Sequence, residues 1–161
     1  MSCEVQLITA IDTNVLLDIF LADENFGEKS SMILRRCLQE GALVACEIVW
    51  AEACAVFPTS EEFAEKMEIL GVSFQPVDRR IAIAAGEAWH AYRQAGGKRT
   101  RVVADFLIGA HAKTCDRLLT RDRGFYRKYF SGLSILDPGQ ALSTKATTTD
   151  ILEAVKESRS S

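Results

Sequence analysis

Apolar and polar stretches alternate along the chain in a way that predicts strands and helices following one another. Residues 5–12 are almost continuously apolar, which is typical of a strand buried on both faces at the centre of a parallel sheet. Apolar residues then recur at helical spacing over residues 13–22 and 26–40. Gly41 is expected to end the second of these helices. The pair of helices can therefore cover one face of the sheet.

The rest of the chain continues the alternation. The pattern predicts strands at 42–48, 72–77, 117–120 and 133–136, and helical segments at 49–57, 60–70, 79–95, 102–114 and 124–130. Pro76 favours an edge position for the strand at 72–77, because proline donates no hydrogen bond to a neighbouring strand. Strands separated by helices pair in parallel through right-handed crossovers. We therefore predict an α/β fold, a three-layer α/β/α sandwich around a central, mainly parallel sheet of four or five strands.

Residues 1–142 are predicted to form one domain, since a chain of 161 residues fits a single core and shows no internal repeat. Residues 143–149 are polar, and Asp150 with Glu153 can cap a last short helix to about residue 156. The segment 143–161 is thus predicted to be a polar tail.

Membrane and secreted classes do not fit the sequence. Asp12 and Asp18 interrupt the first apolar run well before the roughly 20 residues that a membrane span needs. The amino-terminal residues lack the cationic start of a secretory signal. The five cysteines are odd in number, form no C-x-x-C pair and lie in apolar segments, so we expect them to be reduced and buried. The expected location is the cytoplasm.

Charge is divided unevenly along the chain, although the net charge is only −3. Residues 1–78 contain four basic and fourteen acidic side chains, whereas residues 79–128 contain twelve basic and four acidic ones. An acidic first half and a basic second half can place a cation site beside a phosphate-binding wall.

Four acidic residues are predicted to meet at one edge of the sheet. Asp12 ends the first strand, Glu52 follows the second, Asp105 opens a helix, and Asp122 follows the strand at 117–120. Open α/β sheets bind their ligands at the carboxyl ends of the strands. Two carboxylates about 4 Å apart repel each other by roughly 4 kcal/mol at an effective dielectric constant near 20. A divalent cation would relieve this repulsion.

Magnesium or manganese is the expected ion, with Asp12, Asp105 and Asp122 as its ligands, because both metals prefer oxygen donors. Such an ion lowers the pKa of bound water and neutralises phosphate charge, which suits hydrolysis of a phosphodiester. Asn14 and Thr120 can support Asp12 and Asp122 by hydrogen bonds, although a turn or cap role fits these two residues equally well.

Each acidic position also has a purely structural alternative. Asp12 can be a helix cap, Asp105 can interact with the amino end of its own helix, and Asp122 can pair with the arginines on either side. Glu52 is harder to explain in this way, because its neighbours in sequence are apolar. Asp18 is predicted to lie on the surface, more than one helical turn beyond Asp12.

Basic residues adjoin the predicted metal site on two sides and are candidates for contacts with the phosphates of the substrate. They are Lys98, Arg99, Arg101, Arg121 and Arg123. Phe125 and Tyr126 can stack on bases, but burial in the core is the favoured interpretation of Phe125.

Four segments resemble a known family in the family's own order. They are Ile-Asp-Thr-Asn-Val-Leu-Leu-Asp from Ile11, Glu52 in the helix after the second strand, Asp-Phe-Leu-Ile-Gly-Ala-His-Ala from Asp105, and Leu-Leu-Thr-Arg-Asp-Arg-Gly-Phe from Leu118. This pattern is similar to that of PIN domains, and within them to the VapC-type toxin ribonucleases of type II toxin–antitoxin systems.

The resemblance implies a magnesium- or manganese-dependent endoribonuclease in which Asp12, Glu52, Asp105 and Asp122 are the catalytic acids. It also implies a homodimer and a cognate antitoxin that covers the active site. Other members of the family act in RNA processing, so that role stays open.

Two further interpretations come from other classes of protein. A phosphatase of the haloacid dehalogenase type also begins with an aspartate after a strand, but it uses a second aspartate two residues later, where this chain has Asn14. A non-catalytic binding module would use the carboxylates as caps, and it would not bind manganese through them.

Overall fold

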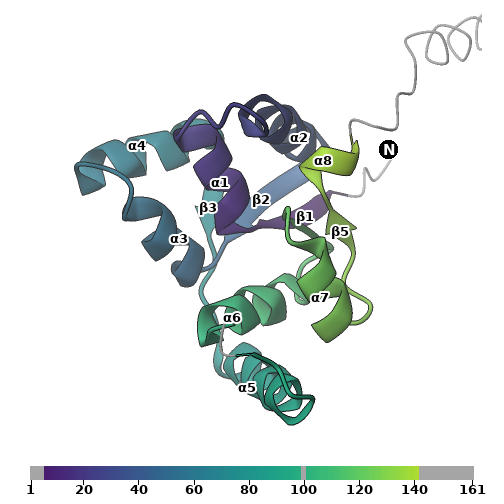
Figure 1. The fold of residues 1–161 in the computed structure, drawn as a ribbon. Helices are drawn as coiled ribbons and strands as arrows, with labels where there is room; N and C mark the ends of the chain where they lie inside the picture. The colour runs from purple at the N-terminus through teal and green to yellow at the C-terminus, as the bar shows by residue number, and fades with distance from the viewer. Residues whose placement is uncertain (1–5, 99–100, 142–161) are drawn as a thin grey trace, which may run out of the picture.

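The computed structural model describes residues 6–98 and 101–141, and within them strands and helices alternate as predicted (Figure 1). The strands are β1 (Leu7–Ile11), β2 (Gly41–Ala45), β3 (Val72–Phe74), β4 (Arg117–Leu119) and β5 (Ile135–Leu136). The helices are α1 (Thr13–Phe20), α2 (Gly27–Glu40), α3 (Glu47–Cys54), α4 (Ser60–Leu70), α5 (Arg79–Gln94), α6 (Val103–Ala112), α7 (Arg123–Tyr129) and α8 (Pro138–Ala141). The predicted polar tail at 143–161 lies outside the described residues.

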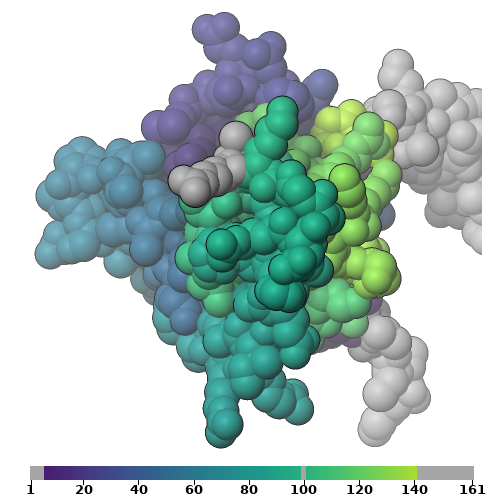
Figure 2. Space-filling model, turned by 60° about the horizontal axis from the view of Figure 1, so that its bottom comes forward, coloured from purple at the N-terminus to yellow at the C-terminus, as the bar shows by residue number. Residues whose placement is uncertain are grey.

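The five strands form one sheet in the order β3-β2-β1-β4-β5, and every neighbouring pair is parallel. Helices α1, α2 and α4 lie on one side of this sheet and α5, α6 and α7 on the other (Figure 1). Turning the lower layer toward the viewer brings α5 to the front (Figure 2). The predicted three-layer α/β/α sandwich is confirmed, and β3 is an edge strand as Pro76 indicated.

The order of the strands reverses direction between β1 and β4. From β1 the chain moves outward to β2 and β3, and it then crosses back to β4 on the other side of β1. Such a switch point leaves a crevice at the carboxyl ends of the two central strands, where α/β proteins bind their ligands. Asp12 and Thr120 directly follow these two strand ends.

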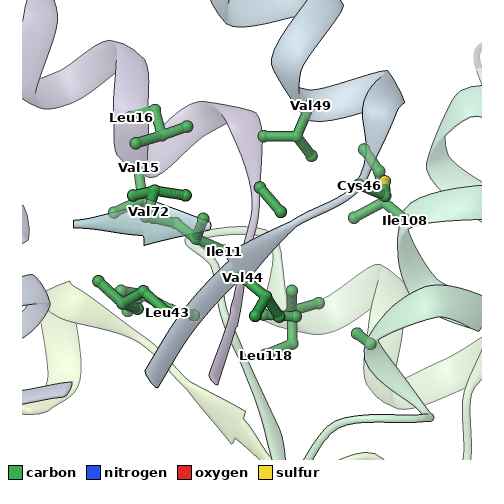
Figure 3. Packing of buried hydrophobic residues seen from close by; sticks show 14 of the residues in the cluster. Ile11, Val15, Leu16, Leu43, Val44, Cys46, Val49, Val72, Ile108 and Leu118 are labelled. Carbon is green, nitrogen blue, oxygen red and sulfur yellow. The ribbon is translucent and has the colours of Figure 1, made fainter. Parts of the chain in front are cut away.

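The core lies on both faces of the central strands, as the unbroken apolar run of β1 predicted. Figure 3 shows part of it, with side chains from the strands and from the helices that cover them. Ile11, Leu43 and Leu118 are fully buried in three neighbouring strands. Because apolar burial contributes about 25 cal/mol per Å² removed from water, these contacts hold the helices against the sheet.

Gly41 shows why the end of α2 can pass directly into β2. A Cβ atom at this position would lie 2.0 Å from the carbonyl oxygen of Leu7 in β1. Only glycine permits this close approach of the two strands, so Gly41 ends the helix as predicted and also begins the strand.

Some boundaries differ from the prediction. The strand predicted at 42–48 ends at Ala45, and α3 begins at Glu47 instead of residue 49, because Cys46 has an extended backbone and occupies the position just before the helix. Helix α8 was not predicted, since Pro138 and Gly139 are typical of a turn. Thr59 caps α4 and Asp78 caps α5, because each side chain accepts a hydrogen bond from the first turn of its helix.

The four cysteines within the described residues are all free. Cys37 and Cys46 are buried as expected, whereas Cys54 and Cys115 are only half-buried, so the prediction of burial is wrong for this second pair. Among the described residues, no helix has the length and apolar character needed to span a membrane.

Candidate active site

Asp12 occupies the crevice at the switch point. Its backbone N–H donates to the carbonyl of Leu119 in β4 at 3.0 Å, so the backbone is fixed between the two central strands. Its side chain caps α1 by accepting a hydrogen bond from the N–H of Thr13 at 2.7 Å. The cap that the sequence offered as an alternative is therefore present. It uses one carboxylate oxygen and leaves the other for further partners.

The second oxygen of Asp12 is held by polar side chains. The hydroxyl of Thr120 donates to it at 2.7 Å, and the amide nitrogen of Asn14 lies 3.3 Å from it. Asn14 also lies 3.4 Å from the hydroxyl of Thr120 and accepts from the N–H of Arg121 at 3.2 Å. Asn14 and Thr120 thus occupy the supporting places that the sequence suggested for them.

Burial raises the pKa of Asp12 from 3.8 to about 6. Asp12 is only 6% exposed, so its charged form loses most of its hydration. Hydrogen bonds from Thr120, the N–H of Thr13 and the hydroxyl of Tyr126 lower the pKa in part, while the charge of Glu52 raises it further. A cation beside Asp12 would stabilise its charged form.

Tyr126 is a member of this site that the sequence analysis did not assign. It is 1% exposed, and its hydroxyl forms a hydrogen bond with Asp12. Burial raises the pKa of the hydroxyl well above its usual value, and the charges of Asp12, Asp105 and Asp122 add to this effect. The available signal was spacing, because Tyr126 lies one helical turn after Asp122 and therefore on the same side of α7.

Asp105 and Asp122 are brought together by a shared arginine. Nη1 of Arg101 lies 2.6 Å from Oδ2 of Asp122 and 3.8 Å from Oδ1 of Asp105. Its guanidinium group also lies 4.3 Å from the ring centre of Phe125, which is buried as predicted. Asp105 in addition accepts from the N–H of Val102 at 3.2 Å, so it stabilises the start of α6. The partner of Asp122 is thus a distant arginine and not a sequence neighbour.

Glu52 reaches the same rim from α3. It is exposed, although its neighbours in sequence are apolar, because it lies on the outer side of the helix. The hydroxyl of Thr13, directly after Asp12, donates a hydrogen bond to Glu52. This contact links Glu52, which lies on the helix after β2, to the segment after β1 that carries Asp12.

The four predicted acids therefore lie in two linked pairs, Asp12 with Glu52 through Thr13 and Asp105 with Asp122 through Arg101, and they do not form a closed metal cage. In the part of the chain that the structure describes, no three His, Cys, Asp or Glu side chains stand close enough together to hold a metal ion. Arg101 lies between Asp105 and Asp122 and supplies positive charge there. The donors nevertheless fit magnesium or manganese, because these ions need only one or two carboxylates and complete their shell with water and phosphate oxygens.

Arg121 does not extend toward the crevice as a phosphate-binding residue would. Its Nε and Nη2 atoms each donate to the carboxylate of Asp18 at 2.8 Å, and its guanidinium lies 4.3 Å from the ring centre of Phe26. Asp18 is 3% exposed and also accepts from the hydroxyl of Ser30. The prediction that Asp18 lies on the surface is wrong, because this arginine compensates its charge inside the protein.

The other predicted phosphate-binding residues have different surroundings. Nε of Arg123 lies 3.6 Å from Asp137, with 39% of the arginine side chain exposed. Lys98 is exposed just after α5, and its carbonyl accepts from the hydroxyl of Tyr92 at 2.6 Å. Arg99 lies outside the described residues.

Comparisons with known proteins concern the family and the fold of the chain. A family model described as the PIN domain matches residues 9–131. No curated protein matches the chain in sequence.

Among solved structures, the chain is similar to one in VapBC2 from Rickettsia felis bound to a promoter DNA fragment, with 17% identity and a TM-score of 0.64, covering 81% of this chain and 98% of that one. VapBC-1 from nontypeable Haemophilus influenzae gives 19% identity and a TM-score of 0.64, covering 83% and 99%. DNA-bound VapBC from Salmonella typhimurium gives 17% identity and a TM-score of 0.60, covering 83% and 99%. These similarities establish a shared fold over most of the chain.

Proposed function

The chain belongs to the PIN domain family, and from this premise we propose that it is a magnesium- or manganese-dependent endoribonuclease. The observation that carries the proposal is the buried carboxylate of Asp12 at the switch point, with Glu52, Asp105 and Asp122 arranged around the same crevice. A non-catalytic scaffold would use its carboxylates as helix caps, and this role does not require four acids from four separate segments at one site.

Asp12, Asp105 and Asp122 are the residues that would hold the ion. When bound, it would supply a water molecule of lowered pKa and neutralise charge on the phosphate. Thr120, Asn14 and Tyr126 orient Asp12 by hydrogen bonds and leave its carboxylate little freedom to turn.

Hydrolysis forms one phosphorus–oxygen bond from water, breaks another, and moves a proton from the water to a base. We assign that base to Glu52. It is exposed at the rim, and its partner is the hydroxyl of Thr13, whereas Asp105 and Asp122 are each close to the guanidinium of Arg101. The leaving oxygen takes a proton from solvent.

The test is RNA cleavage by the purified protein with magnesium or manganese. Asp12→Asn and Asp105→Asn are expected to lower the rate by at least about 100-fold while the protein stays folded, and EDTA is expected to stop cleavage. Asp78→Asn is the matched control, since Asp78 is an exposed cap at the start of α5 and asparagine also caps helices. Cleavage that survives both substitutions or EDTA would contradict the proposal.

We further propose that this nuclease is the toxin of a VapBC-type pair and that it binds RNA, a cognate antitoxin and a second copy of itself. The fold shared with three VapBC structures supports this assignment. Expression of the wild-type chain without a partner is expected to arrest growth, and Asp12→Asn is expected to relieve the arrest. Normal growth with abundant soluble wild-type protein would favour the alternative, a PIN nuclease of RNA processing.

The family match and the position of Asn14 both argue against a phosphatase of the haloacid dehalogenase type. The family match is to a different family, and Asn14 donates to Asp12 instead of providing an acid. Manganese titration separates the nuclease from a non-catalytic module, because only the nuclease should lose manganese binding in Asp12→Asn.

A further inference from the structure

A cavity of about 560 Å³ lies between α5 and the start of α6. Helix α5, which forms one wall, runs across the front of Figure 2. The cavity falls within the range of about 300–1,000 Å³ typical of small-molecule sites. The residues that give it its character are Trp89, Arg93, Lys98, Arg101, Val102 and Val103.

The cavity is adjacent to the acidic crevice, because the two share Arg101. This side chain lines the cavity and also contacts Asp122 at 2.6 Å. A polymer whose phosphate lies among the carboxylates would therefore have its next unit within reach of the cavity. The proposed function leaves this second site without a role.

The lining combines aromatic and apolar surface with positive charge. Trp89 is half-buried and packs one side against Phe106, with ring centres 6.3 Å apart and planes inclined by 25°. Val102 and Val103 are unusually exposed for valines, at 55% and 42%. No acidic side chain is among the lining residues that the structure gives for this cavity.

Cations occupy the polar part of the same lining. Arg93 lies 5.8 Å from the ring centre of Trp89, and Lys98 and Arg101 also line the cavity. Protein sites for single-stranded nucleic acid pair aromatic surface for the bases with lysine and arginine for the backbone. A ligand with a flat apolar ring and a phosphate has the complementary chemistry.

We propose that this cavity binds a nucleobase of the RNA strand, from a nucleotide next to the phosphate that is cleaved. The base lies against Trp89 and the two valines, and Arg93 and Lys98 contact the adjoining backbone phosphate. The proposal rests on the proposed function in one respect, since it takes the bound polymer to be RNA. It makes the cavity a determinant of how tightly the enzyme holds the strand.

The experiment measures binding of a fluorescein-labelled, mixed-sequence single-stranded RNA by anisotropy, in an Asp12→Asn background that does not cut it. Val103→Glu places a carboxylate at an exposed position of the cavity and is expected to weaken binding about tenfold. Ile83→Glu is the matched control, because Ile83 is 53% exposed on α5 and does not line the cavity. It is expected to leave binding within about twofold of the parent.

A second series separates base binding from charge effects. Bases are removed one at a time from the RNA, and one abasic position is expected to weaken binding about tenfold in the parent protein but not in Trp89→Leu. If Trp89→Leu does not fold, the same comparison is made with Val103→Glu.

Two outcomes would overturn the inference. One is equal binding by Val103→Glu and Ile83→Glu, and the other is the absence of any abasic position whose effect depends on the cavity. Either result would indicate that the cavity binds a protein partner and not a nucleobase. Failure of wild-type protein to cleave RNA would instead contradict the nuclease proposal, and the binding data would remain a separate result.

Discussion

The carboxyl group of Asp12 has a pKa near 6 in the folded protein, against 3.8 without burial. Between these pH values the folded state binds more protons at this group than the unfolded state does, so its contribution to stability increases as the pH falls. Above pH 6 the folded protein holds a charge that burial disfavours. The cost is up to about 3 kcal/mol, taking 1.36 kcal/mol for each pKa unit.

Asp12→Asn is therefore expected to raise the free energy of unfolding at pH 7.5 in EDTA, although it abolishes the proposed activity. The gain should shrink as the pH is lowered through 6 toward 4, because wild-type Asp12 then becomes protonated. Urea denaturation at a series of pH values measures both effects. Asp78→Asn is the control and should keep the wild-type pH dependence, and a variant that is less stable than wild type at pH 7.5 would refute this account.

The hydroxyl of Tyr126 is expected to matter for metal binding more than for stability. Groups that hold a metal ligand in place typically change metal affinity by about 10–100-fold when removed. Tyr126→Phe keeps the buried ring and removes only the hydrogen bond to Asp12. We expect manganese to bind about tenfold more weakly, measured by calorimetry without RNA. Tyr129→Phe, on the same helix, should bind manganese like wild type, and equal affinities in the two variants would argue against a positioning role.

At this scale the sequence could indicate some site residues and not others. Asp12 and Asp122 follow strands whose apolar runs are visible in the sequence, so the edge of the sheet where they lie could be predicted. Asp18, Arg121 and Tyr126 depend on contacts between distant segments. Spacing alone could not show that Arg121 and Asp18, 103 residues apart, form a pair.

The ion pair between Asp18 and Arg121 joins two elements of the fold. Asp18 lies on α1, and Arg121 lies in the turn between β4 and α7 that also carries Asp122. Arg121→Ala would leave a carboxylate that is 3% exposed without its cation, and breaking buried pairs in this way typically costs about 3–5 kcal/mol. We expect a loss of this size in urea denaturation at pH 7.5.

The control for this prediction is Arg123→Ala, because Arg123 is 39% exposed and its contact with Asp137 is long, at 3.6 Å. Its loss should be below about 1 kcal/mol. Adding Asp18→Asn to Arg121→Ala should recover part of the stability, since no buried charge then remains. Equal losses in Arg121→Ala and Arg123→Ala would show that the pair does not stabilise the turn.

The order of the elements could be predicted more securely than their ends. Periodicity averages over many residues, and it gave all five strands and the α1 to α7 segments. Ends depend on single residues, such as Cys46, whose extended backbone moves the start of α3 to Glu47. Helix α8 follows a short turn and packs against α2, and no local sequence pattern predicts this contact.

In the whole molecule, both layers of helices contribute acids to one crevice. Asp12 and Glu52 come from the side of α1 and α3, while Asp105 and Asp122 come from the side of α6 and α7. The basic half of the sequence folds mainly into this second layer, so Arg101 and the cavity lie beside the acids. The division of charge along the chain thus becomes a division across the crevice.

Arg101 is expected to compete with a metal ion for Asp105 and Asp122, because its guanidinium is the cation that now lies between them. In Arg101→Ala the two carboxylates lose this partner, so the protein in EDTA should be less stable than wild type. The same substitution should strengthen manganese binding about tenfold, which is within the usual range for coupling between two sites. Lys98→Ala removes a neighbouring cation and should change manganese affinity by less than about twofold.

Thermal unfolding with and without manganese tests this competition across the whole fold. A ligand that binds only the folded protein stabilises it by about 2.7 kcal/mol at 100 times its dissociation constant. At one manganese concentration, Arg101→Ala should therefore gain more stability than wild type, and Asp12→Asn should gain little. If Arg101→Ala and Lys98→Ala gain equally, Arg101 acts only through its general charge. If Arg101→Ala gains less than wild type, the guanidinium group supports the ion instead of competing with it.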